Sequence, residues 1–304
     1  MENKILRIDC PRKIKNSSKV YSFFIKVNKS MKDFTGTTVL INFSKTKVFD
    51  VNILSLLFFS IEEQRANGKQ IFVMLPDLKV YDEKNVIMSL FNYYANDKRA
   101  FFKPRVIGGE NVREEEDILL KFLKKLELKN YDKFKTLLSE LFTNIKMHTE
   151  SKVGFISGSV TTDENMITVS ISNAQYSIAK QLEIKKGMIF ENELSALIWA
   201  LKKTNTTRDD SESGGLGLYL LRKYINELNG FATILSGGCY VEFDSSCFNI
   251  DNENEIIINY SEEMEQEYEG TIITISIPYI VRDPKSIEIN ERINLINIWD
   301  IMEE

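Results

Sequence analysis

The chain has 304 residues, 43% of them hydrophobic and 27% charged, a balance typical of globular proteins long enough for about two domains. Its net charge of −5 gives no general electrostatic case for nucleic-acid binding. The N-terminus has no signal-peptide core, and the longest apolar run, residues 53–59, is far shorter than a membrane span. The sequence therefore favours a cytoplasmic protein without a membrane segment. The three cysteines form no closely spaced pair, which suits reduced thiols: Cys10, Cys239 and Cys247.

Residues 1–105 alternate between strand-like and helix-like patterns, which is typical of an α/β layer domain. Strands are expected at 4–8, 37–43 and 69–76, and helices at 17–33, 51–68 and 83–97. Residues 106–130, with charge runs and a Gly pair at the start, suit a connector.

Residues 131–280 are expected to form a second domain, and residues 281–304 a helical tail. The patterns predict a helix from 131, a hairpin of 152–160 with 165–173, helices at 191–203 and 217–230, and a closing strand at 270–279. Two further strands are expected around residues 231–245. Within the acidic insert 249–270, the Glu-rich residues 262–269 are interpreted as a solvated loop.

Two segments carry the chemistry. The first, ELFTNIKMH, places Glu140, Asn144 and His148 four residues apart and so on one helical face. The second, SGGLGLYLLR at 213–222, is a glycine-rich turn leading into an apolar helix, which presents backbone N–H groups to phosphate. An amide oxygen suits Mg²⁺ when phosphates supply the charge, and a carboxylate can orient or deprotonate a nucleophile.

In this order the two segments resemble the ATP-binding domain of the GHKL superfamily, which includes gyrase, histidine kinases and mismatch-repair ATPases. The resemblance covers about residues 131–280 and implies helices on one face of a mixed sheet. It implies Mg²⁺ and ATP as cofactors, Glu140 as the catalytic base and Asn144 as the metal ligand. A lid would be drawn from about 183–213. The remaining nucleotide-binding residues it implies are His148, Asn173, Thr206, Thr207, Arg208, Gly214, Gly215, Leu216, Gly217, Leu218 and Thr271.

The sequence departs from the family at its first glycine box. Asn173 stands where the family has an adenine-reading Asp, and Gln175 and Ser177 stand where it has glycines. The amide can still accept a hydrogen bond but without charge, a loss of about 1 kcal/mol. A turn that needs positive φ would cost each non-glycine residue about 1–2 kcal/mol more. The loop therefore has a different shape here, or the nucleotide differs.

Plainer interpretations stand beside these. Glu140 and Asn144 can be surface polar residues of an amphipathic helix, His148 a helix-end residue, and the glycines a tight turn. Residues 206–208 can be plain loop, and Tyr176 and Trp199 core or pocket wall.

The N-terminal domain weakly resembles STAS-type domains, such as anti-anti-sigma factors, over residues 39–57. Asp50 lies in the matching loop, but Val51 and Asn52 follow where regulatory members carry a phosphorylated serine. An α/β docking or dimerisation module is the alternative for this part.

We expect an ATP-binding regulatory protein whose lid controls association with a protein partner or a second copy, possessing slow ATPase activity if Glu140 acts as base. A non-catalytic nucleotide-sensing scaffold and an anti-sigma-type serine/threonine kinase stay open. A histidine kinase is disfavoured because His148 is the chain's sole histidine.

Overall fold

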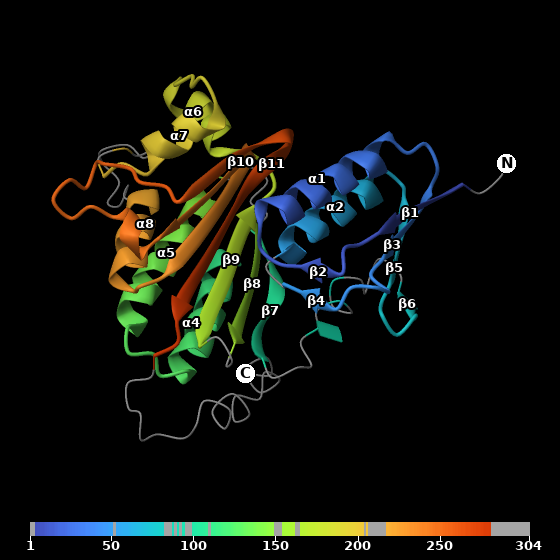
Figure 1. The fold of residues 1–304 in the computed structure, drawn as a ribbon, viewed down its shortest axis with the longest axis horizontal. Coiled ribbons are helices and arrows are strands. Elements are labelled where there is room, and N and C mark those ends of the chain that lie inside the picture. Colours follow the sequence, from blue (N-terminus) through green and yellow to red (C-terminus); the bar gives the residue numbers. More distant parts are fainter. Residues whose placement is uncertain are drawn as a thin grey trace. The chain divides into compact units, whose positions relative to one another are not determined.

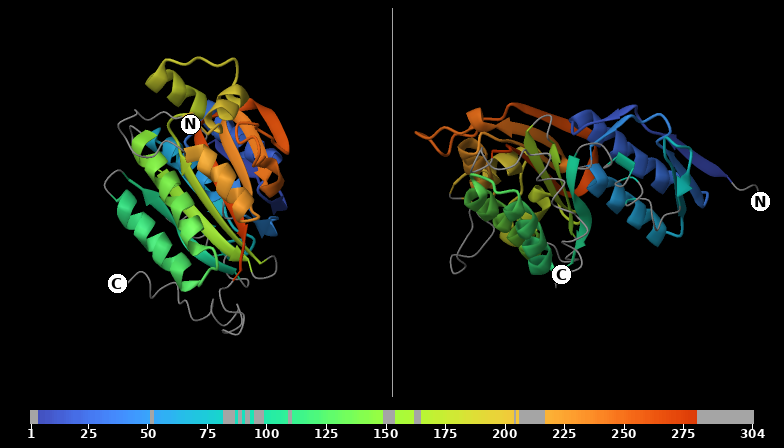
Figure 2. Two further views of the ribbon diagram at one scale, coloured as in Figure 1. Left: turned by 90° about the vertical axis from the view of Figure 1, so that its left-hand side faces the viewer. Right: turned by 90° about the horizontal axis from the view of Figure 1, so that it is seen from below.

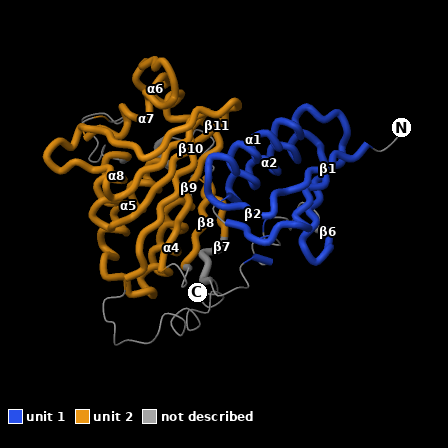
Figure 3. Tube along the Cα trace, in the orientation of Figure 1, with its two compact units in different colours: residues 1–97 blue, residues 98–304 orange. Residues whose placement is uncertain are grey.

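The computed structural model divides into two compact units, residues 1–97 and 98–304 (Figure 3). Each unit mixes helices and strands, as the sequence predicts. Within the described part of the chain, none of the helices combines the length and hydrophobicity that crossing a lipid bilayer requires. The structure describes residues 4–50, 53–81, 87, 90, 93–94, 99–108, 111–148, 154–161, 165–203, 205 and 217–280.

The first unit is built on a four-stranded sheet of order β1-β3-β5-β6. β1, β3 and β5 run parallel, as the strand–helix alternation predicts, and β6 joins antiparallel to β5. A separate parallel pair, β2 with β4, completes the strands described in this unit. The strands are β1 (Ile5–Asp9), β2 (Lys13–Ile14), β3 (Thr38–Asn42), β4 (Val48–Phe49), β5 (Gln70–Met74) and β6 (Val80–Tyr81).

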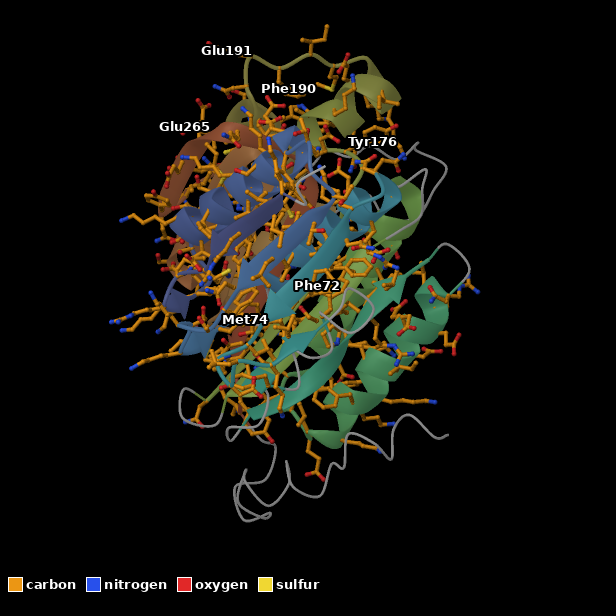
Figure 4. All side chains as sticks on the ribbon, turned by 90° about the vertical axis from the view of Figure 1, so that its right-hand side faces the viewer. Phe72, Met74, Tyr176, Phe190, Glu191 and Glu265 are labelled. Atoms are coloured by element: carbon orange, nitrogen blue, oxygen red, sulfur yellow. The ribbon has the colours of Figure 1, made fainter. Side chains whose placement is uncertain are left out.

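Two helices, α1 (Ser18–Asp33) and α2 (Leu54–Ala66), pack against each other in this unit. Strand side chains alternate between the faces of the sheet, so Ile71 and Val73 of β5 are fully buried. Phe72 and Met74, which are labelled in Figure 4, are half-buried on the opposite face of the same strand.

Asp50 has a structural contact in its loop. Its carboxylate accepts a hydrogen bond from the backbone N–H of Asn16 at 3.2 Å. Positions 51–52, where regulatory STAS-type domains carry a phosphorylated serine, lie outside the described residues. So does most of the helix expected at 83–97.

The second unit is built on a five-stranded sheet of order β10-β11-β9-β8-β7. All four pairings in it are antiparallel, so the mixed sheet that the family resemblance implies is wrong for these strands. The hairpin expected from the alternating patterns at 152–160 and 165–173 is confirmed as β8 with β9. The strands are β7 (Arg99–Ile107), β8 (Gly154–Thr161), β9 (Met166–Asn173), β10 (Phe231–Asp244) and β11 (Tyr260–Pro278).

Helices α4 (Val112–Lys125), α5 (Tyr131–His148) and α8 (Gly217–Glu227) lie along one face of this sheet (Figure 1). The left-hand view of Figure 2 shows them as a layer in front of the strands. α5 contacts both α4 and α8, and its buried residues Phe134, Leu138 and Phe142 join the core beneath it. The helix-on-one-face arrangement therefore holds for this unit.

The expected connector at 106–130 is wrong. Residues 99–107 form β7 at the edge of the sheet, and α4 follows as part of the helix layer, so the second unit begins at 98 rather than 131. Pro104 of β7 lies at a register shift between Phe102 and Arg105. A residue without an N–H is tolerated at such a bulge on an edge strand.

The solvated loop expected at 262–269 is wrong. β11 begins at Tyr260, and its Glu-rich part pairs with β10, with Glu263 opposite Cys239. The two strands expected around 231–245 are likewise one continuous β10, with register shifts at the glycine pair in place of a break. The expected helical tail, 281–304, lies outside the described residues.

Two short helices, α6 (Ile178–Lys186) and α7 (Glu193–Ala200), lie at one end of the sheet (Figure 1). α7 confirms the helix expected around 191–203. Ala196, Leu197 and Leu201 are fully buried in the core of the unit. The segment 183–213, for which a lid is predicted, is thus anchored in the core at these three residues. Most of the segment beyond Leu201 lies outside the described residues.

Candidate functional site

A row of three polar side chains crosses the sheet of the second unit where its helix-facing core ends. On β9, Ile167, Val169 and Ile171 belong to that core, and Asn173 is the next position on the same face. Thr271 of β11 is the direct cross-strand partner of Asn173. Ser236 of β10 is in turn the partner of Thr271. The row Asn173–Thr271–Ser236 therefore lies at one level of three neighbouring strands.

Asn173 is the member of the row with an unmet hydrogen-bonding capacity. Its side chain is 7% exposed, and Oδ1 finds no hydrogen-bond partner among the described residues. Its backbone carbonyl, by contrast, accepts a hydrogen bond from the Tyr268 hydroxyl at 2.9 Å. A buried acceptor without a donor costs about 1–3 kcal/mol. The side chain thus suits a donor brought by a ligand.

Thr271 and Ser236 belong to an internal network. Their hydroxyl oxygens are 3.3 Å apart, and Ser236 Oγ donates to Glu193 Oε1 at 2.6 Å. Thr271 Oγ1 donates to the backbone carbonyl of Tyr176 at 3.3 Å. Thr271, which was expected beside the adenine, is 6% exposed. Its hydroxyl holds the segment that follows β9 in place.

That segment, residues 174–177, replaces the family's first glycine box with a helix start. Ser177 is the N-cap of α6, with φ −67° and its hydroxyl accepting from Lys180 N at 3.2 Å. None of the residues from 173 to 178 has a positive φ. The expected cost of replacing glycines at Gln175 and Ser177 therefore does not arise, and the loop has a different shape.

The helix α5 carries the expected catalytic pair. Glu140 and Asn144 are both half-buried and lie one turn apart on the same face. α5 packs on β9, the strand that ends in Asn173, and on α8, the helix that follows the glycine-rich segment. His148 ends α5, but its side chain is outside what the structure describes.

The rest of the expected phosphate site is described only at its edge. Gly217 begins α8, and the helix expected there is confirmed, with Leu218 packed partly against the core. The residues Thr206, Thr207, Arg208, Gly214, Gly215 and Leu216 lie outside the described residues.

A pocket of about 440 Å³ opens beside the polar row, between the starts of α6 and α7 and the glycine pair of β10. Figure 4 shows Tyr176 of its lining, with Glu191 at the same end of the unit. Its lining includes one lysine and five carboxylates: Lys180, Glu191, Glu193, Glu263, Glu267 and Glu269. This surplus of negative charge would repel a triphosphate. The phosphates of a nucleotide near Asn173 would therefore have to lie away from this pocket.

The thiol of Cys239, which also lines this pocket, is affected by the same negative charges. Burial raises its pKa to about 12, and the negative charges of Glu193 and Glu263 contribute to the increase. Within the described ranges, no three His, Cys, Asp or Glu side chains gather closely enough to hold a metal ion. A magnesium ion would thus depend on phosphate oxygens with Asn144 as its protein ligand.

Comparison with protein-family models found no match, and neither did comparison with curated proteins. Sequence reasoning selected Asn173 and Thr271 but missed Glu193, Ser236 and Tyr268, which position them. Only Glu193 had a signal in the sequence, since Asn192 and Glu193 open an apolar stretch as a helix start does.

Proposed function

We propose that the second unit is a nucleotide-binding domain of the GHKL type, which takes ATP with Mg²⁺ and whose output is the control of a protein association. The base would lie at the Asn173 end of β9. The phosphates would extend toward α5 and the start of α8, because both helices lie on the face to which Asn173 belongs.

The observation that carries the proposal is the buried amide oxygen of Asn173, for which no partner is found among the described residues. Folded proteins rarely keep a buried acceptor without a donor, and exceptions need an explanation such as a ligand or water. A nucleobase supplies flat apolar faces and edge donors, which suit such a position at the end of a hydrophobic core.

The chain offers groups that fit the remaining parts of the nucleotide. The backbone N–H groups of the glycine-rich segment and the N-terminus of α8 suit phosphate oxygens. Asn144 offers a neutral oxygen to the metal ion, which when bound neutralises phosphate charge. Glu140, one turn earlier, would orient or deprotonate a nucleophile aimed at the terminal phosphate. The first unit, with its mostly parallel sheet, would provide the docking module.

Thermal unfolding of the full chain tests the proposal. Ligand at about one hundred times its dissociation constant adds about 2.7 kcal/mol of stability. We expect ATP with Mg²⁺ to raise the melting temperature of the wild type and to have a smaller effect on Asn144→Ala. Lys135→Ala, an exposed position of the same helix, serves as the matched control and should respond like the wild type. No shift with ATP, ADP or a non-hydrolysable analogue would contradict the proposal.

Turnover separates an enzyme from a sensing scaffold. If phosphate release is detected and Glu140→Ala removes it while the nucleotide-dependent shift survives, Glu140 is the base. Nucleotide binding without release in the wild type would leave a non-catalytic scaffold, a reading that the loss of the glycine box around Gln175 and Ser177 favours.

A further inference from the structure

Asn173, at the site expected to bind the base, carries an amide rather than a carboxylate. This difference determines which bases it can recognise by hydrogen bonding. An Asn side chain carries an acceptor oxygen and a donor NH₂ group, which exchange places when the amide turns by half a rotation. A carboxylate at neutral pH only accepts. Asn173 therefore can meet either a donor or an acceptor on a base edge.

The described surroundings of Asn173 offer its amide oxygen no donor that would fix it. Its Oδ1 has no hydrogen-bond partner among the described residues, so no described donor selects which end faces outward. The two hydroxyls of the row are committed elsewhere, Thr271 to the Tyr176 carbonyl and Ser236 to Glu193. The choice of orientation is thus left to the ligand.

We propose that this site accepts 6-keto purine nucleotides as well as 6-amino ones, an inference that rests on the nucleotide-binding function proposed above. A 6-amino group donates to Asn173 Oδ1. A 6-keto group accepts from Asn173 Nδ2 after the amide turns. A carboxylate at the same position would place two acceptors against each other at the 6-keto group and would disfavour the keto purine.

The experiment compares ATP with ITP, which differ only in the 6-substituent and the N1 proton, by calorimetric titration of the full chain with Mg²⁺. For the wild type we expect dissociation constants within about tenfold of each other. Asn173→Asp should weaken the binding of ITP relative to that of ATP by at least about tenfold. The reason is that a buried acceptor placed opposite another acceptor discriminates strongly between ligands. Gln175→Glu makes the same amide-to-acid change two residues away and should leave the ratio unchanged.

A wild type that prefers ATP over ITP by more than about a hundredfold would overturn this inference while leaving the nucleotide site standing. An unchanged ratio in Asn173→Asp would also overturn it, because Asn173 would not read the base. Binding of neither nucleotide to the wild type would instead reject the proposed function itself. The wild-type ratio needs no variant, so a misfolded Asn173→Asp would not prevent the test.

Discussion

The carboxylate of Glu193 and the hydroxyl of Ser236 join the first turn of α7 to β10 through a hydrogen bond of 2.6 Å. The same carboxylate oxygen accepts the backbone N–H of Ala179 at 3.0 Å, and Ser236 Oγ accepts the N–H of Ile178 at 2.8 Å. One side chain pair therefore satisfies two of the free N–H groups at the start of α6. It also fixes both short helices to the end of the sheet that carries Asn173.

Removing Glu193 should destabilise this end of the unit. Glu193→Ala leaves the fully buried Ser236 without its shortest hydrogen bond, and we expect a loss of about 1–3 kcal/mol in the free energy of unfolding. Urea denaturation measures it. Glu191→Ala removes a carboxylate from the same pocket at an exposed position and should change stability by less than about 0.5 kcal/mol. Equal effects of the two variants would refute the structural role of Glu193.

Replacement by alanine should destabilise the protein at one glycine of the β10–β11 pair and be tolerated at another. A Cβ at Gly270 would meet the carbonyl oxygen of Asn173 at 2.3 Å, whereas a Cβ at Gly238 would meet nothing closer than 3.4 Å. Gly270→Ala should therefore cost about 1–3 kcal/mol or more and displace the Asn173 backbone. Gly238→Ala should be tolerated. Thermal unfolding compares them, and a stable Gly270→Ala would show that the strands do not approach this closely.

Much of the second unit could be predicted from the sequence. The period-2 patterns of β8 and β9 and the apolar period of α5 gave those elements nearly at their true bounds. The Glu-rich part of β11 carried the same period, since Glu263, Glu265 and Glu267 are exposed and alternate with more buried residues. Its high charge concealed that pattern, because a strand with one solvent face tolerates charge at every second position.

The candidate site was predictable in its separate residues but not in its connections. The spacing of Glu140 and Asn144 fixes their common face without any fold. The row of Asn173, Thr271 and Ser236, in contrast, depends on the register of three strands, which local sequence does not specify. The replaced glycine box was readable as a departure, yet only the backbone showed that Ser177 caps a helix there.

The cysteines should be slow to react in the native protein. Cys10, Cys239 and Cys247 are all buried and free. With a pKa of about 12, Cys239 exists as thiolate in only about one molecule in ten thousand at pH 8, and the thiolate is the reactive form. Burial likewise raises the pKa of Cys10. A thiol-specific chromogenic reagent should release three equivalents in denaturant and far less in buffer; rapid labelling of the native chain would contradict this burial.

Asp244 should contribute stability that depends on pH. Hydrogen bonds from the hydroxyl and the backbone N–H of Ser246 lower the pKa of this carboxyl below its ordinary value. A depressed folded pKa stabilises the fold above the unfolded value of about 3.9 and loses that effect as pH falls through the folded pKa. Asp244→Asn should therefore be less stable than the wild type at pH 7.

The difference between Asp244→Asn and the wild type should shrink as the pH drops below about 4, where the carboxyl takes up a proton. Unfolding curves at several pH values measure it. Asp251→Asn, an exposed acid in the loop that follows, is the control and should show little difference at any pH. A gap for Asp244→Asn that persists unchanged at low pH would assign the effect to packing rather than to charge.

Calorimetric titration of ATP with Mg²⁺ into the wild type and into Asn173→Leu tests the central claim most directly. Leu has the same branched arrangement of side-chain heavy atoms but neither donor nor acceptor, so the variant removes the hydrogen bond without leaving a cavity. We expect saturable binding of one nucleotide per chain in the wild type and at least about tenfold weaker binding in the variant. Equal affinity in both, or no binding by the wild type at millimolar nucleotide, would contradict a nucleotide site at Asn173.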